Sequence, residues 1–126
     1  MGEGFRDRIV WQRAIELTAA IYEFTRDFPR EELYALTNQL RRAAVSIPSN
    51  IAEGHGRNTD GQLLQFVCMA RGSNYEVQTQ LEIAERLRYG AADKRAICHA
   101  LSIEVGKMLN ATVASLEVRR GAISKI

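Results

Sequence analysis

The chain has 126 residues, of which 46% are apolar, 25% charged and 7% aromatic. These values predict one globular domain over residues 1–126 with a core over about 5–120, and they exclude a disordered tail, a collagen-like repeat and a disulfide scaffold. The net charge of +2 is too small to indicate any class of partner by itself. Only two prolines and nine glycines interrupt the chain. We therefore predict long helices rather than a turn-rich all-β fold.

The first predicted helix runs from Asp7 to Phe28, where apolar residues recur at alternating steps of four and three. It ends before Pro29, because the residue before a proline is driven out of the α region. The second predicted helix starts near Leu33 and continues through Pro48, which removes one backbone donor and predicts a kink. Glycines at positions 54 and 56 predict a left-handed cap at its end.

Thr59 and Gln62 form a capping box in front of a third predicted helix, which continues to about Tyr89. Asp93 is the predicted N-cap of a fourth helix that ends near Arg120. Four long helices with short links predict an all-α fold, an antiparallel up-and-down four-helix bundle. The N-terminus lacks an apolar signal-peptide core and no apolar run approaches the length of a membrane span, so we predict a cytoplasmic protein.

Few residues have the spacing that catalysis or metal binding needs. Glu53 with His55, and Cys98 with His99, lack a third partner at helical spacing, and the Glu-x-x-His signature of a di-iron bundle is absent. The loop at residues 54–61 could hold a phosphate at the start of the third helix, but Asp60 in the first turn would repel it. We therefore predict a structural turn there, no cofactor and no metal, and a protein that is not an enzyme.

A second group of residues suggests packing or interface roles. Polar side chains recur along one face of the second helix, and small residues follow Arg71 in the third. Gly72 inside a helix predicts a close contact as compensation, and Asn74 in the apolar seam suggests a residue that fixes register. If Pro48 kinks the helix, Asn50 and Glu53 can turn toward the third helix, where Arg71 or Asn74 can satisfy them. Arg71 and Glu76 lie on the same side of the third helix. An ion pair with Arg42 or Glu53 of the second helix can therefore also form. We expect structural or interface roles for Pro48, Asn50, Glu53, Arg71, Gly72, Asn74 and Glu76.

Three segments resemble a known family: residues 9–17, the run 34–54 that contains Arg-Arg-Ala-Ala-Val-Ser-Ile-Pro-Ser-Asn-Ile-Ala-Glu-Gly, and residues 70–81 with Ala-Arg-Gly-Ser. They are similar to the four-helix bundle proteins encoded within intervening sequences of bacterial 23S ribosomal RNA genes. The resemblance covers about residues 5–118. It implies a bacterial four-helix bundle that assembles into a homo-oligomer, in characterised relatives a pentamer. It also implies an association with RNA, inferred mainly from where the genes lie, and it implies no established activity.

Two functions from different classes follow. The first is an oligomer that binds structured RNA or another nucleic acid by sequence-independent phosphate contacts, because several cations lie near helix ends or on the polar face of the second helix and no aromatic pair is interleaved with arginine. The residues expected to make these contacts are Arg41, Arg42, Arg57, Arg119, Arg120 and Lys125. The alternative is a structural or protein–protein interaction module without nucleic-acid binding. The two differ in whether these arginines share one exposed face.

Overall fold

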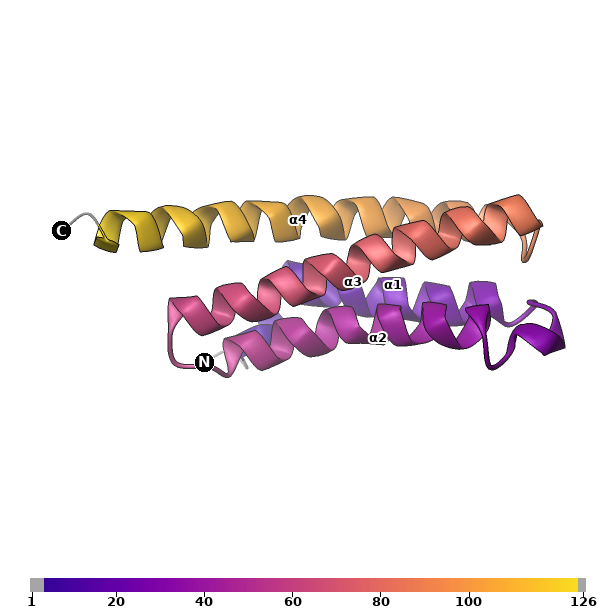
Figure 1. Cartoon of the computed structure of the whole chain (residues 1–126), viewed down its shortest axis with the longest axis horizontal. Coiled ribbons are helices and arrows are strands. Elements are labelled where there is room, and N and C mark those ends of the chain that lie inside the picture. Colours follow the sequence, from indigo (N-terminus) through magenta and orange to yellow (C-terminus); the bar gives the residue numbers. More distant parts are fainter. Residues whose placement is uncertain (1–3, 125–126) are drawn as a thin grey trace.

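The computed structural model describes residues 4–124, and every regular element in this range is helical. A short turn, η1 (Gly4–Asp7), precedes α1 (Ile9–Thr25), and a second turn, η2 (Arg30–Glu32), precedes α2 (Leu36–His55). The longer pair is α3 (Asp60–Leu87) and α4 (Ala92–Ser124). Figure 1 shows the four helices side by side, with successive helices running in opposite directions. The predicted antiparallel four-helix bundle is therefore confirmed.

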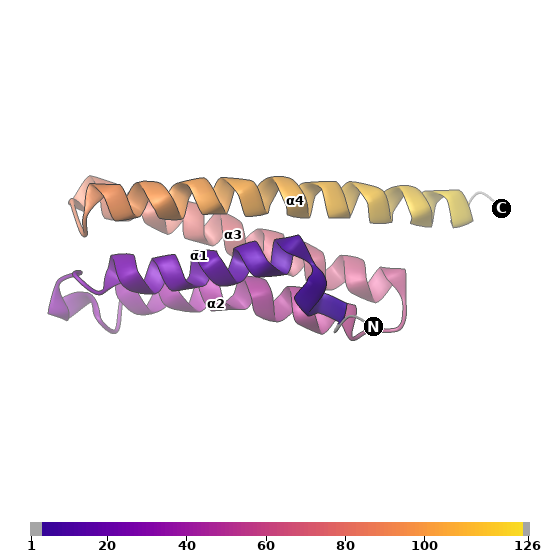
Figure 2. The ribbon, with the colours of Figure 1, turned by 180° about the vertical axis from the view of Figure 1, so that it is seen from behind.

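The helices form a closed ring of contacts. α1 packs against α2 and α4, and α3 packs against the same two helices from the other side. Seen from behind, α1 lies beside α2 and below α4, whose C-terminal end runs past the link between α2 and α3 (Figure 2). The link between α2 and α3 and the C-terminal part of α4 thus lie at one end of the bundle. The corner formed by η2 lies at the other end.

The apolar seam predicted for the first helix lies in the core. Ala14, Leu17, Ile21 and Phe24 are fully buried, and Phe28 is nearly so. Burying each of the larger side chains stabilises the fold by about 1.5–3 kcal/mol. The seam succeeded as a predictor because residues three and four apart lie on one face of a helix.

Two helix ends in the middle of the chain differ from the prediction. The amide of Gly56 bonds to the carbonyls of Ala52 and Glu53, which keeps Gly56 at φ −84° rather than in a left-handed cap. α3 ends at Leu87, two residues before the predicted Tyr89, because Arg88 takes the left-handed conformation at φ 60°. Bonds from the amides of Arg88 and Tyr89 to the last turn complete a Schellman motif there.

The starts of the last two helices give one confirmation and one correction. The amide of Gln62 donates to Thr59 Oγ1 at 3.1 Å, so Thr59 is confirmed as the N-cap of α3, although among the described residues the reciprocal bond from the Gln62 side chain that completes a capping box is not formed. α4 begins at Ala92, one residue before the predicted cap Asp93, whose carboxylate instead accepts from the amide of Lys94. The helix starts earlier because the carbonyl of Ala91 already accepts the first helical bond.

Pro48 is buried inside α2, and the helix continues through it to His55. The expectation that Asn50 and Glu53 then reach Arg71 or Asn74 on α3 is wrong. Asn50 and Glu53 instead form hydrogen bonds with residues that are near them in the sequence. Side chains one turn apart on a helix reach each other more readily than side chains of a neighbouring helix.

The partners of these two residues lie on α2 and in the loop after it. Asn50 Nδ2 donates to the carbonyl of Ser46 at 2.8 Å and to its hydroxyl at 2.9 Å. Glu53 accepts a hydrogen bond from Arg57 at 2.6 Å. Neither side chain bonds to α3 directly, but Asn50 holds the Ser46 hydroxyl, which is in turn bonded to Ser73 of α3.

Arg71 points toward α4 rather than α2. Its Nη1 lies 3.4 Å from Asn110 Oδ1 at an exposed position. The predicted ion pair of Arg71 with α2 is therefore wrong, and a substitution there is a surface change worth at most about 1 kcal/mol. Asn74, by contrast, is fully buried and exchanges two hydrogen bonds with Ser102 of α4, as expected of a polar residue inside the seam.

Gly72 has no close neighbour within the bundle. A Cβ added to it would meet nothing within 4 Å, so the expected close contact is absent from the described part of the chain. The small residue that does permit helix contact is Ser73, whose hydroxyl lies 2.8 Å from that of Ser46. Glu76 is exposed beside this pair and lines a hollow between α2 and α3.

Candidate functional site

A groove of about 640 Å³ opens on the surface between α1 and the beginning of α2. Its walls combine aromatic, apolar and cationic side chains, and none of the described residues that line it is acidic. They are Tyr22, Leu33, Tyr34, Thr37, Asn38, Arg41, Arg42, Val45 and Ser46. The groove therefore offers aromatic surface and positive charge together, and this combination suits an anionic ligand with flat apolar parts.

Arg41 is held in place on one wall of the groove. Its Nε donates to Thr25 Oγ1 at 2.8 Å, and its guanidinium carbon lies 4.7 Å from the centre of the Tyr22 ring. The hydroxyl of Thr25 can accept this bond because its own proton goes to the carbonyl of Ile21. The two terminal amino groups of Arg41 make no hydrogen bond or ion pair with the described residues. They are the groups that pair with a phosphate or carboxylate in a fork.

Arg42 is exposed next to Arg41 and makes no ion pair within residues 4–121, the range whose side chains the structure describes. The nearest acid in sequence, Glu32, is engaged elsewhere: it accepts bonds from the amide of Leu36 and from the hydroxyl of Tyr89. Burial, and then the charge of Glu32, raise the pKa of Tyr89, so this hydroxyl stays protonated and able to donate. Neither arginine of the groove forms an ion pair with a described residue, and Glu76, which lines the adjoining hollow with Arg42, is an acid that the structure places beside them.

Sequence reasoning missed the aromatic members of this site. Tyr22 and Tyr34 are twelve residues apart, and only the reversal of the chain at η2 brings them to one groove with Arg41 and Arg42. The prediction that no aromatic pair is interleaved with arginine is therefore wrong. The available signal was that Tyr22 lies off the apolar seam of its helix, where an aromatic side chain faces outward.

Of the other predicted cations, Arg57, Arg119 and Arg120 lie at the opposite end of the bundle, and each has an interaction with another group. Arg57 pairs with Glu53 and lies 4.9 Å from the ring of Phe66. Arg119 makes two bonds to the carboxylate of Asp60, at 2.7 and 3.1 Å. The bond between Asp60 and Arg119 supports the prediction of a structural turn at residues 54–61.

Arg120 packs against Gly61 and has an interaction of its own, and Lys125 lies outside the described residues. The predicted cations thus do not share one face. Arg42 lies about 20 Å along α2 from His55, at 1.5 Å per residue, and Arg57 lies beyond that end of the helix. Arg41 and Arg42 line the groove, whereas Arg57, in the link after α2, and Arg119 and Arg120, on α4, lie at the other end of the bundle.

Other chemistries find little support among the described residues. Burial raises the pKa of Cys98 to about 11, so its thiol is protonated at neutral pH and is a weak nucleophile. Burial and the nearby charge of Arg8 lower the pKa of His55. Within residues 4–124, no cluster of three His, Cys, Asp or Glu side chains could hold a metal ion, and no helix is long and apolar enough to cross a membrane.

The chain is similar to a known protein family and to a solved structure. The sequence profile of the 23S rRNA-intervening sequence protein family matches residues 6–111, a range that reaches into all four helices. The chain belongs to this family. A crystal structure of a protein of unknown function from the S23 ribosomal protein family of Bacteroides thetaiotaomicron is similar, with a TM-score of 0.74 at 20% sequence identity, covering 83% of this chain and 98% of that one. No curated protein matches the chain.

The match to the 23S rRNA-intervening sequence protein family confirms the resemblance of the motifs around Arg41 and Arg42. The matched range contains the whole groove, including Tyr22 and Tyr34, and ends before Arg119. The groove thus belongs to the part of the chain that the family profile describes. The cations at the end of α4 lie beyond it.

Proposed function

We propose that this protein is a non-enzymatic, oligomeric four-helix bundle that binds nucleic acid through the groove between α1 and α2. The observation that carries the proposal is the pair Arg41 and Arg42, which line one groove with two tyrosines and no carboxylate. Phosphates supply most of the affinity in nucleic-acid complexes, and they require cations that are not already neutralised. Arg41 and Arg42 meet this requirement better than Arg57 and Arg119.

Changing both Arg41 and Arg42 to alanine tests this proposal. Binding of a fluorescein-labelled RNA stem–loop with single-stranded flanks is followed by anisotropy while the salt concentration rises from about 50 to about 200 mM. We expect the double variant to bind about 10- to 100-fold more weakly at low salt, and the slope of log K against log salt to flatten by about 1.4–1.8. The reason is the loss of two phosphate contacts.

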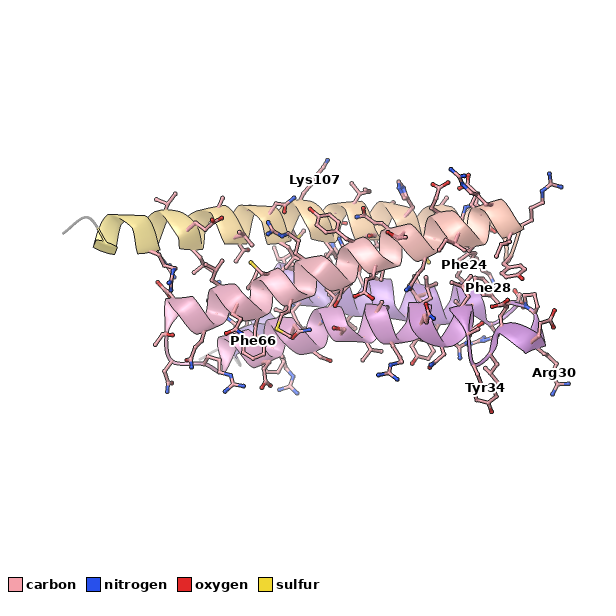
Figure 3. The ribbon with its side chains drawn as sticks, viewed as in Figure 1. Phe24, Phe28, Arg30, Tyr34, Phe66 and Lys107 are labelled. Atoms are coloured by element: carbon pink, nitrogen blue, oxygen red, sulfur yellow. The ribbon has the colours of Figure 1, made fainter. Side chains whose placement is uncertain are left out.

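Two matched double variants serve as controls. Arg86→Ala with Lys107→Ala makes the same change of charge on α3 and α4, away from the groove; Figure 3 shows Lys107 projecting from the side of the bundle opposite Tyr34. Arg57→Ala with Arg119→Ala removes the predicted contacts at the other end. If the wild-type protein fails to bind the RNA at about 50 mM salt, nucleic-acid binding is wrong. If only the second control weakens binding, the groove is the wrong site.

A second candidate function, assembly through protein contacts, is favoured by the outward side of α3. Met69, Tyr75, Ile83 and Leu87 are all exposed there, and Gly72 among them leaves room for a neighbouring backbone. Exposed apolar side chains gathered on one face are typical of a protein interface. We propose this face as the contact between copies in a homo-oligomer, with a pentamer expected from the family resemblance.

Light scattering tests the oligomer directly. We expect a mass several times the 14.2 kDa of one chain at micromolar concentration. Ile83→Lys on the outward side of α3 should lower that mass toward one chain, because it places a charge in an apolar contact. The matched control is Ile97→Lys on α4, where the isoleucine is also exposed. A wild-type mass of 14.2 kDa would contradict assembly, and equal effects of the two variants would contradict the assignment to α3.

A further inference from the structure

We infer that the groove takes an unpaired, single-stranded segment of the nucleic acid, with a base stacked on its aromatic surface. This inference rests on the proposed function and names the form of ligand that fits the same site. A ligand that binds through its phosphates alone needs only cations from the protein. In a double helix the faces of the bases are stacked and cannot contact a protein side chain. The side chains that go beyond a simple phosphate contact are Tyr22, Tyr34 and Thr37.

Tyr34 is 90% exposed, so its ring is free to pack against a ligand. Figure 3 shows it projecting away from the helices at the corner before α2. Single-strand binding proteins use exposed aromatic rings of this kind, because every base has a face that can stack. The adjoining Leu33 and Val45 are also more than one third exposed and extend the apolar surface.

The backbone that carries Tyr34 is fixed although its side chain is exposed. The amide of Ala35 donates to the carbonyl of Glu32 at 3.0 Å, and the amide of Gln39 donates to the carbonyl of Ala35 at 3.0 Å. The carboxylate of Glu32 also accepts from the amide of Leu36 at 3.2 Å. A base that stacks on Tyr34 therefore meets a corner that is already ordered, which lowers the entropic cost of binding.

Across the groove, Tyr22 and Arg41 form a second flat surface. The guanidinium already lies over the Tyr22 ring, and arginine planes stack on bases as aromatic rings do. Since Nε is bonded to Thr25, the terminal amino groups are the ones left to meet a phosphate. Arg41 thus offers both a flat surface and a positive charge. A single-stranded ligand has a base that can stack on the flat surface and a phosphate that can pair with the charge.

The wall of the groove also contains an unused polar group. Thr37 lines the groove and is only 3% exposed. Its Oγ1 has no hydrogen-bond partner among the described residues. Thr37 is the second residue of α2, so no turn of that helix precedes it whose carbonyl could accept its proton. This hydroxyl is covered in the free protein, so it meets the edge of a base only when the Thr37 side chain turns toward the groove as the ligand binds.

The test compares three labelled probes of equal length: a single-stranded RNA, the corresponding RNA duplex, and an abasic strand with the same phosphates and no bases. We expect the full-length protein to bind the single strand most tightly. Tyr34→Ala should weaken single-strand binding by about 5- to 150-fold, the loss of one stacked base. The same change should leave binding of the duplex and the abasic strand unaltered, and Tyr34→Phe should preserve stacking.

The outcomes separate this inference from the proposed function. Equal affinity for all three probes, or a Tyr34→Ala effect of the same size on the abasic strand, would overturn the stacking inference while phosphate binding through Arg41 and Arg42 stands. Displacement of the single-stranded RNA by polyglutamate at equal charge concentration would overturn it in favour of an acidic peptide as ligand. Failure to bind any probe would overturn both.

Discussion

Replacing Asn74 with alanine is expected to lower the free energy of unfolding by about 2–4 kcal/mol. Asn74 and Ser102 are both fully buried, and each donates to the other's residue: Asn74 Nδ2 to the carbonyl of Ser102 at 2.9 Å, and Ser102 Oγ to Asn74 Oδ1 at 2.7 Å. The substitution removes both bonds and leaves a cavity, and these two losses add. Urea denaturation at one fixed protein concentration measures the change, since assembly makes stability depend on concentration.

A double-mutant cycle identifies the bond as the cause. Ser102→Ala alone should cost about 1–3 kcal/mol, because it leaves the buried Asn74 oxygen without a donor. The double variant should cost less than the two single changes together, by about 0.5–3 kcal/mol. Additive effects would mean that Asn74 acts only by filling space. Gly106 of α4 supports the pairing, since a Cβ there would lie 3.1 Å from Asn74 Nδ2.

Gly90→Ala is the second substitution with a large expected effect, a loss of about 2–5 kcal/mol. Gly90 has a φ of +75° in the link between α3 and α4, a conformation that a side chain disfavours by about 1–2 kcal/mol. A Cβ there would also collide with the ring of Phe24 and press on Phe28. These rings already pack edge to face with their centroids 5.0 Å apart, so overpacking adds about 1–3 kcal/mol.

Gly121→Ala is the matched control for this prediction. The same change near the end of α4 meets no atom within 4 Å and improves helix propensity, so it should stabilise the folded chain by up to about 0.5–1 kcal/mol. Thermal unfolding of the two variants under identical conditions should therefore shift in opposite directions. Similar shifts would show that the turn at Gly90 is not constrained by Phe24.

The sequence predicted the helices well where periodicity governs. The seam from Ala14 to Phe28, the cap at Thr59 and the continuation of α2 through Pro48 all depend on neighbours within one or two turns. Helix ends were less predictable. Arg88, not a glycine, takes the left-handed position that ends α3, because two bonds from the following backbone stabilise it.

The candidate site could be predicted only in part. Arg41 and Arg42 were visible as cations on the polar face of a helix, yet nothing in their own segment indicated Tyr22. Two pairs link α3 to α4: Arg71 with Asn110, 39 positions apart, and Asn74 with Ser102, 28 positions apart. Sequence reasoning had directed these side chains to α2 or had left their partners open.

The sequence by itself thus determined an all-α bundle of four helices and its family. The fold follows from the local spacing of apolar residues and the family from a distinctive run of residues, and both depend only on positions close together in the chain. Only the tertiary structure decided which arginines are neutralised and which remain available. That outcome depends on contacts between helices: Asp60 reaches Arg119 across 59 positions, whereas none of the described residues that line the groove at Arg41 and Arg42 is acidic. Charge counted along a chain does not reveal such pairing, because a salt bridge needs two side chains within about 4 Å in space.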